Sequence, residues 1–336
     1  MKRRRLPVIT LLILAPVFGE LVSSSSPPKE FFTPIGFILL VALYGCGALF
    51  IRELARHWGK GWMSIFLLGL AYGIFEEGIF MRSFFDPSWQ DLGVFNVYGR
   101  WLGVNWVWAI GLMLFHAIVS ITLPILLVET AFPQEQTEPW LGRKGLIITG
   151  LVFISTVLLT PLFSHYQTIP GIAGSIAVII MLLWLAYRLP KKYAPPTVRK
   201  SPLKPGWIGL ASLTVMLGYI ILFWGFASIG IPALISFLAL CGYPLFILWL
   251  IQKFEVPLLN DSQKWAAAFG SMIPWALLDF ISEADNPNRP DDTTGMAFVG
   301  LALIAGILLL GRKVQKRNDK LKAQPEHEEI KQEQPV

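Results

Sequence analysis

The sequence predicts an all-α, polytopic membrane protein with about ten transmembrane helices. Of its 336 residues, 54% are hydrophobic and 15% are charged, and the mean hydropathy is +0.58. Apolar runs of about 20 residues, the length that crosses a hydrocarbon core, recur along the chain. Because this composition offers too little polar surface to cover a soluble globule, we expect a multi-pass protein of the cell membrane, in contact with the lipid bilayer.

The expected spans follow one another closely, so residues 1–311 are read as one transmembrane helical domain. Residues 312–336 mix both charge signs with few apolar residues and predict a disordered cytoplasmic tail. The first span is also typical of a cleavable signal peptide, but its poor cleavage pattern and the apolar span directly after it favour an uncleaved helix. The expected spans are 6–23, 32–52, 62–82, 104–128, 145–164, 170–187, 207–226, 231–251, 265–283 and 295–311.

The distribution of Lys and Arg predicts the orientation, because basic residues in short loops remain preferentially on the cytoplasmic side. MKRRR, the 188–206 loop and GRKVQKRNDKLK fall on one side, and the 82–103 loop falls on the other. Both termini are therefore expected in the cytoplasm and the 82–103 loop outside. The basic residues are then explained by the orientation of the protein in the membrane and by contact with anionic lipid headgroups, so no nucleic acid partner is expected.

Ionisable side chains inside the expected spans are the strongest functional signal. The segment AYGIFEEGIFMRSFF carries Glu76 and Glu77 in the third span and Arg82 at the end of that span. Three further ionisable residues lie on other expected helices: Glu20, His116 and Asp279. A charge in the bilayer is costly, so such groups usually face a bundle interior or a watery cavity. On the predicted topology, Glu20, Glu76, Glu77 and Asp279 lie in the outer part of the membrane, with His116 near the middle. These residues predict a polar cavity open to the outside, lined by a buried, central third span.

A purely structural interpretation stands beside this one. Glu76 and Glu77 would then be a hydrogen-bonded pair that holds helices together. Glu20 would end the first helix before SSSSPP, and Arg82 would extend to the interface or pair with Glu77 or Asp86.

The 82–103 loop is rich in aromatic residues, which are favoured at a headgroup boundary. Asp86, Arg100 and Asn105 lie among or just after these aromatics as candidate substrate-binding residues. Three glycines, Gly93, Gly99 and Gly103, permit tight turns. The loop is therefore expected either to form an interfacial belt or to fold as a lid that selects substrate.

A Glu-Glu pair followed by an arginine on one helix, with a histidine on the next, resembles the CPBP family of intramembrane proteases, which includes CAAX-processing and bacteriocin-immunity-type enzymes. The resemblance covers about residues 70–116. It implies that Glu76 or Glu77 is the general base, His116 its partner and Arg82 a positioning residue. EEGIFMR has four residues between the second Glu and the Arg where the family has three, Leu112 stands where the family has Phe, and the family's later histidine motif has no counterpart here.

Chemistry leaves three functions open: a glutamate/histidine-type hydrolase, a proton-coupled transporter of a small polar or cationic solute, and a non-catalytic scaffold. Two adjacent carboxyls in a poorly solvated site cannot both ionise cheaply, so we expect one to stay protonated at neutral pH. Such a pair suits general-base catalysis and proton coupling alike. Glutamates beside a histidine can also hold zinc where three ligands converge. The sequence assigns no metal or cofactor, and the substrate, peptide or small molecule, is not identified by it.

Overall fold

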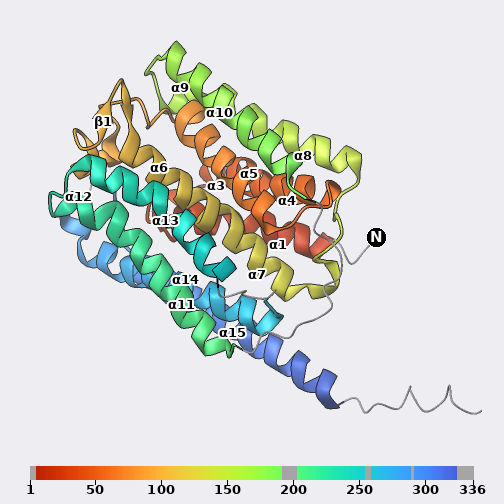
Figure 1. Cartoon of the computed structure of the whole chain (residues 1–336). Coiled ribbons are helices and arrows are strands. Elements are labelled where there is room, and N and C mark those ends of the chain that lie inside the picture. The colour runs from red at the N-terminus through yellow and green to blue at the C-terminus, as the bar shows by residue number, and fades with distance from the viewer. Residues whose placement is uncertain (1–4, 191–202, 254–258, 289–290, 324–336) are drawn as a thin grey trace, which may run out of the picture.

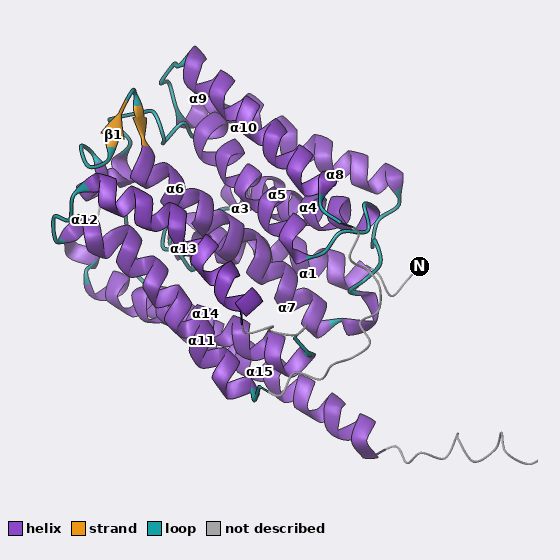
Figure 2. Ribbon diagram, viewed as in Figure 1, coloured by secondary structure: helices purple, strands orange, loops and turns teal. Residues whose placement is uncertain are grey.

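The computed structural model describes residues 5–190, 203–253, 259–288 and 291–323, which form a bundle of helices (Figures 1 and 2). Within these residues nine helices are long and apolar enough to cross a membrane. The first helix is shorter: α1 (Arg5–Pro16) continues without a break into a π-helical turn, η2 (Val17–Leu21). The predicted fold class is confirmed.

The membrane-length helices and their connections have the following bounds. They are α3 (Pro34–Leu40), η3 (Val41–Gly45) and α4 (Cys46–His57); α5 (Trp62–Ile74) and η4 (Phe75–Phe80); α6 (Trp106–Phe115), η6 (His116–Thr122) and α7 (Leu123–Ala131); α8 (Arg143–Ser155), η8 (Thr156–Leu159) and α9 (Thr160–Phe163); α10 (Ile169–Arg188); α11 (Pro205–Ile220), η9 (Ile221–Gly225) and α12 (Phe226–Ser228); α13 (Ala233–Lys253); α14 (Asp261–Ala284); and α15 (Met296–Ala323). The connections include α2 (Pro28–Phe31), the 3-10 turns η5 (Gln90–Phe95), η7 (Pro133–Glu135) and η10 (Asn286–Asn288), and the strands β1 (Arg100–Trp101) and β2 (Val104–Asn105).

Capping and turn residues explain several of these boundaries. The Thr33 hydroxyl accepts a hydrogen bond from the Gly36 N–H, and proline follows at the first helical position. Asn260 and Gln263 form a reciprocal capping box at the start of α14. Gly59, with φ of +66°, lies just after the end of α4.

Two helices continue well beyond the ends of the predicted spans. The second span runs to His57 instead of residue 52, because Arg52 and Arg56 are buried and ion-paired within the helix. The last helix runs to Ala323 instead of 311, so residues 312–323 are helical and not a disordered tail. This extension contacts its neighbours: Arg317 lies 2.8 Å from Asp261, and Asn318 donates to Ser262. Residues 324–336 of the predicted tail lie outside the described residues.

The helix α5 is central in the bundle, as expected for the third span. It packs against α4, α6, η6 and α10, and its membrane segment is 61% buried, compared with 11% for α13. The last helices form a group in which α14 lies between α11 and α15. The β1–β2 hairpin lies at one end of the bundle, and the start of α1 and the end of α15 lie away from it (Figure 1).

A buried ion network ties α4 to α7 at the end away from the hairpin. Arg52 contacts Glu53 at 2.6 Å and Glu129 at 3.1 Å. Arg56 contacts both oxygens of Glu129 at 2.8 Å. The Glu53 carboxylate accepts from the backbone N–H groups of Trp140 and Leu141, which holds the 132–142 connection against the bundle. Arg52 and Arg56 therefore have a structural role as buried ion-pair residues.

Candidate functional site

Four π-helical turns carry a group of buried ionisable residues that the sequence singles out, together with one tyrosine. Glu20 lies in η2, Tyr44 in η3, Glu76 and Glu77 in η4, and His116 in η6. These turns face one another, since η2 contacts η6, α1 contacts η3, and α5 contacts η6. We name these five residues the carboxylate–histidine cluster. Single π turns are rare within α-helices and are frequent at functional sites, so their coincidence here marks this region.

The imidazole of His116 lies between the two adjacent glutamates. Its Nδ1 is 3.3 Å from Glu76 Oε2, and its Nε2 is 3.1 Å from Glu77 Oε1. The Ser120 hydroxyl, one turn further along, is 3.1 Å from Nδ1. Both ring nitrogens therefore have carboxylate neighbours, an arrangement that favours the doubly protonated ring or a protonated carboxyl.

The Tyr44 hydroxyl joins Glu20 to Glu76. It lies 2.5 Å from Glu20 Oε1 and also contacts Glu76 Oε1 in a very short hydrogen bond. A hydroxyl has one proton to donate, so it can satisfy only one carboxylate at a time. The other contact is a hydrogen bond only if that carboxyl is protonated and donates to the tyrosine oxygen. Glu20 is also bound by the Ser26 hydroxyl at 2.7 Å, so it belongs to the cluster and is not merely a helix end.

The second oxygen of Glu77 is held from the hairpin end of the bundle. The Ser83 hydroxyl donates to Glu77 Oε2, and Trp108 Nε1 donates to the Ser83 oxygen at 3.0 Å. With Oε1 next to His116, both oxygens of Glu77 have fixed partners. The orientation of this carboxylate is therefore set by residues from three segments of the chain.

Close helix approach, permitted by glycines, brings the cluster together. A Cβ at Gly19 would overlap the ring of Tyr44, so only glycine lets η2 lie this near to η3. A Cβ at Gly73 would lie 3.0 Å from Met113 Cα and 3.3 Å from His116 Cβ. Because Gly73 lies one turn before Glu77, this contact places the glutamate opposite the histidine.

The cluster is closed to solvent except at one carboxylate. The side chains of Glu76 and His116 are 2% and 3% exposed, whereas that of Glu77 is 12% exposed. The sequence predicts a polar cavity open to the outside; in the structure the Tyr44 hydroxyl lies between Glu20 and Glu76, and the side chains of the cluster are largely buried. Of the Glu76, His116 and Glu77 side chains, that of Glu77 is the most exposed.

Three members of the cluster have the donor set for a metal ion. One ligand atom from each of Glu76, Glu77 and His116 lies within 4.8 Å of the others. Two carboxylates and an imidazole suit a divalent cation such as zinc. Of these atoms only His116 Nε2 and Glu77 Oε1 are hydrogen-bonded to each other, whereas Glu76 Oε2 is buried and has no hydrogen-bond partner among the described residues.

The other candidates of the loop region have structural roles. Arg82, with φ of +62°, donates to the Tyr166 carbonyl at 2.6 Å and pairs with neither Glu77 nor Asp86. Asp86 accepts from the backbone and hydroxyl of Ser88 in a turn. Arg100 donates to three loop carbonyls, and Asn105 caps α6 by accepting from Trp108 N–H and donates to the Phe95 carbonyl. Among the described residues, none of these four side chains forms a hydrogen bond or ion pair with the carboxylate–histidine cluster.

The glycines of this loop form the turns that were expected. Gly93, Gly99 and Gly103 all have positive φ. Leu102 and Gly103, with φ of +53° and +77°, form the tight turn between β1 and β2. The loop packs against the bundle, since the Asn105 N–H donates to the Phe84 carbonyl and the Phe95 ring stacks on Phe223 at 4.9 Å.

Asp279 lies apart from the cluster. It is fully buried on α14, and its Cβ lies close to Gly300 of α15. Neither of its carboxylate oxygens has a hydrogen-bond partner within the part of the chain that the structure describes. The predicted grouping of five ionisable residues thus holds for Glu20, Glu76, Glu77 and His116, and not for Asp279.

Sequence reasoning missed Tyr44, Ser83, Ser120 and Trp108. A tyrosine or serine in an apolar span is ordinary, and only the glycines at 45 and 47 next to Tyr44 hint at close packing. Their roles follow from tertiary contacts with residues far away in the sequence.

The fold and this site define a multi-pass integral membrane protein with a closed, ionisable centre. The chain belongs to a family described as an uncharacterized membrane protein family, whose sequence profile matches residues 9–316. An uncharacterized protein of Archaeoglobus fulgidus is 27% identical over 117 residues, which are 34% of this chain and 36% of that protein. The match thus spans about a third of that relative's length. No solved structure matches the chain.

Proposed function

We propose that the chain is an intramembrane hydrolase of the glutamate/histidine type, similar in chemistry to the CPBP proteases. The observation that carries this proposal is the His116 ring, held between Glu76 at 3.3 Å and Glu77 at 3.1 Å. Carboxylates paired with an imidazole in a poorly solvated site are suited to general acid–base work.

Glu77 is the proposed general base. It is the more exposed of the two glutamates, so a water molecule can reach it. Its two oxygens are fixed by His116 and by Ser83, which keeps the carboxylate in one orientation. A fixed base contributes more to catalysis than a mobile one, because the reacting geometry is set before the reaction.

In the proposed reaction, Glu77 takes a proton from water as the water oxygen attacks the carbonyl carbon of a peptide bond. The same proton then passes from Glu77 to the leaving nitrogen as the carbon–nitrogen bond breaks. The products are a carboxylic acid and an amine, and Glu77 returns to its ionised form. His116 donates a hydrogen bond to Glu77 throughout and limits the build-up of charge on it.

Glu76, Tyr44 and Glu20 are positioning residues in this account. Glu76 holds the Nδ1 side of His116, and Tyr44 links Glu76 to Glu20. This chain shares protons among the buried carboxyls, so that the region need not hold three full negative charges. Arg82, which the family resemblance implies is a positioning residue, would act here by holding the Tyr166 segment.

Proton-coupled transport is the second candidate, supported by the series of polar groups from Ser26 to Ser83, which are hydrogen-bonded in turn except between Glu76 Oε2 and His116 Nδ1, 3.3 Å apart. Both ends of this series lie in connections predicted to be on the outer side. A transported proton must also reach the opposite side, and hydrolysis needs no such path. The arrangement therefore favours hydrolysis.

The test compares cells that lack the chain with cells that carry the wild type, Glu77→Gln or Asp279→Asn. Asp279→Asn is the matched control, since it changes another buried intramembrane carboxyl outside the cluster. Mass spectrometry of protein N-termini should detect new termini in membrane proteins with the wild type and the control, and none with Glu77→Gln. Identical N-termini in all four strains would overturn the proposal. Proton uptake by proteoliposomes under an imposed pH gradient, lost in Glu77→Gln, would favour the transport alternative.

A further inference from the structure

An apolar groove runs along the bundle between α1, α7 and α15. Its volume is about 680 Å³. The lining residues are almost all hydrophobic and include Leu14 and Phe18 from the first helix, Leu127 from α7, and Leu303 and Leu310 from α15. On α15 the groove extends from Phe298 to Leu310, about 18 Å at 1.5 Å per residue. This length exceeds one leaflet of a hydrocarbon core of about 30 Å, so the groove matches an acyl chain in size and polarity.

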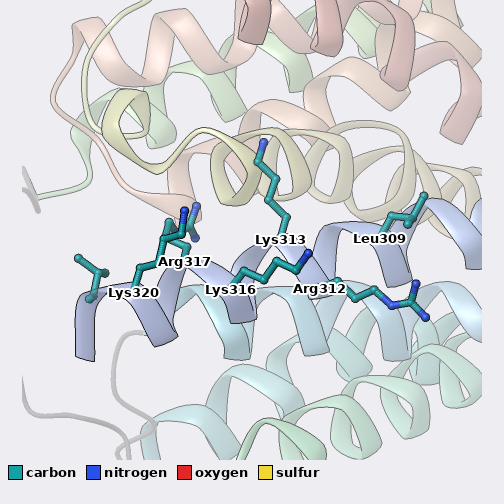
Figure 3. Close-up of a pocket in the computed structure, with 7 residues that line it drawn as sticks. Leu309, Arg312, Lys313, Lys316, Arg317 and Lys320 are labelled. Atoms are coloured by element: carbon teal, nitrogen blue, oxygen red, sulfur yellow. The ribbon is translucent and has the colours of Figure 1, made fainter. Parts of the chain in front are cut away.

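A basic groove follows on the same helix, where α15 extends past the apolar part of the bundle. Its volume is about 710 Å³, and it is lined by Leu309, Arg312, Lys313, Lys316, Arg317, Lys320 and Leu321 (Figure 3). No carboxylate of the described residues lines it. Arg317 is engaged with Asp261, while Arg312, Lys316 and Lys320 have no ion pair within residues 5–190, 203–253, 259–288 and 291–323.

The two grooves meet on one face of α15. Leu303, Ile307 and Leu310 of the apolar groove are followed at helical spacing by Lys313 and Arg317 of the basic groove. Lys313 and Arg317 point toward the neighbouring helix in Figure 3. The Lys313 Nζ lies 5.2 Å from the centre of the Phe132 ring, and Phe132 directly follows Ala131, which lines the apolar groove.

We propose that these two grooves together form a binding site for one anionic phospholipid. The acyl chain lies in the apolar groove between α1, α7 and α15, and the phosphate headgroup contacts Arg312, Lys313 and Lys316. Cations next to a membrane-embedded apolar surface are the chemistry that recognises an anionic headgroup and its chain together. The predicted orientation places the site in the cytoplasmic leaflet, where anionic lipid attracts such clusters.

Another occupant with matching charge exists in the chain itself. The segment after Ala323 contains Glu326, Glu328, Glu329 and Glu333. The apolar groove distinguishes the two, because this acidic segment offers no apolar run that would fill it, whereas a phospholipid satisfies both grooves at once.

The test measures the association of spin-labelled phosphatidylglycerol and phosphatidylcholine with the full chain in bilayers, by electron paramagnetic resonance. The triple variant Arg312→Gln, Lys313→Gln, Lys316→Gln removes the three charges that the proposal assigns to the headgroup. We expect it to lower the preference for phosphatidylglycerol by at least about fivefold. The matched control, Arg143→Gln with Lys144→Gln and Arg188→Gln, removes the same charge from exposed residues on α8 and α10 and should leave the preference unchanged.

A second variant tests the apolar groove. A Cβ at Gly306, which lines the apolar groove, would meet no atom within 4 Å, so Gly306→Leu places a side chain there with no clash at its Cβ. We expect it to reduce the bound fraction of both labelled lipids. Equal losses in the two triple variants, or full binding in Gly306→Leu, would overturn the proposal. If preference for phosphatidylglycerol appears only when the four glutamates after Ala323 are changed to glutamine, the acidic segment occupies the groove and the proposal is wrong.

Discussion

The Nε2 atom of His116 lies 3.1 Å from Glu77 Oε1, although the two residues are 39 positions apart. This contact joins α5 to α6 through two π-helical turns, in the most buried part of the bundle. The adjacent Glu76 approaches the other side of the same ring. The pairing of one imidazole with two carboxylates is the basis of the proposed chemistry, and it also predicts how the protein responds to substitution.

Removal of the His116 ring should destabilise the fold as well as stop the reaction. His116→Ala leaves Glu76 and Glu77 in a buried site without their shared partner, and breaking a buried pair in this way costs about 3 kcal/mol or more. We expect a lower unfolding temperature in detergent and no hydrolytic activity. His116→Gln keeps a hydrogen-bonding side chain and should recover part of the stability but none of the activity. Unchanged stability in His116→Ala would show that the contacts with the two glutamates contribute little to folding.

The Tyr44 hydroxyl should be required for activity in a way that another buried tyrosine is not. Tyr44→Phe removes the group between Glu20 and Glu76 and leaves buried carboxyl oxygens without a partner, at a cost of about 1–3 kcal/mol. Tyr219→Phe is the control, since its hydroxyl donates to the Gly111 carbonyl outside the cluster. Both variants should unfold at lower temperature, and only Tyr44→Phe should lose activity. Equal activity in the two would exclude a role for the Glu20–Tyr44–Glu76 connection.

Glu129 should be among the residues most important for stability. It bonds to both Arg52 and Arg56 inside the protein, so Glu129→Gln leaves buried positive charge without compensation. We expect a loss of about 3–5 kcal/mol in the free energy of unfolding. Asp292→Asn breaks the exposed pair with Lys29 and should leave the free energy of unfolding nearly unchanged, because water screens an exposed ion pair. Unfolding titrations of both variants make the comparison, and a similar small effect in each would contradict the structural role of the network.

The orientation in the membrane is a prediction from the Lys and Arg distribution. Reporter fusions after Lys200 and after Asp91 should report opposite sides, with the first in the cytoplasm. The same side for both would remove the assignment of the carboxylate–histidine cluster to the outer half of the membrane and of the basic groove to the cytoplasmic leaflet.

The fold class, the approximate spans and the central position of α5 could be predicted from the sequence, because apolar length and intramembrane charge reflect the bilayer directly. Because a charge is costly to bury in the bilayer, the sequence also predicts that Glu20, Glu76, Glu77 and His116 lie together, and the structure places them together. The π-helical turns could not be predicted, since they depend on packing against other helices and leave no periodic signal. For the same reason Tyr44 and Ser83 were missed.

The errors have a physical pattern as well. The ion pairs of Arg52 and Arg56 with Glu129 could not be predicted, because the sequence does not show that Glu129 lies opposite them. The position of Asp279 could not be predicted from its depth in the membrane. Depth along a helix does not show toward which neighbouring helix a side chain points, and Asp279 lies next to Gly300 of α15. The end of α15 was read as disordered from its charge, although Asp261 and Ser262 of α14 bind it.

The most direct test of the central claim is the activity of the double variant Glu76→Gln, Glu77→Gln. Glutamine keeps the size and hydrogen bonding of both side chains and removes their titratable protons, so the variant should fold and insert normally. If the pair performs proton chemistry, the wild-type pattern of new N-termini in membrane proteins disappears in the double variant. If the well-folded double variant keeps that pattern, the glutamates only hold helices together and the proposed function is wrong.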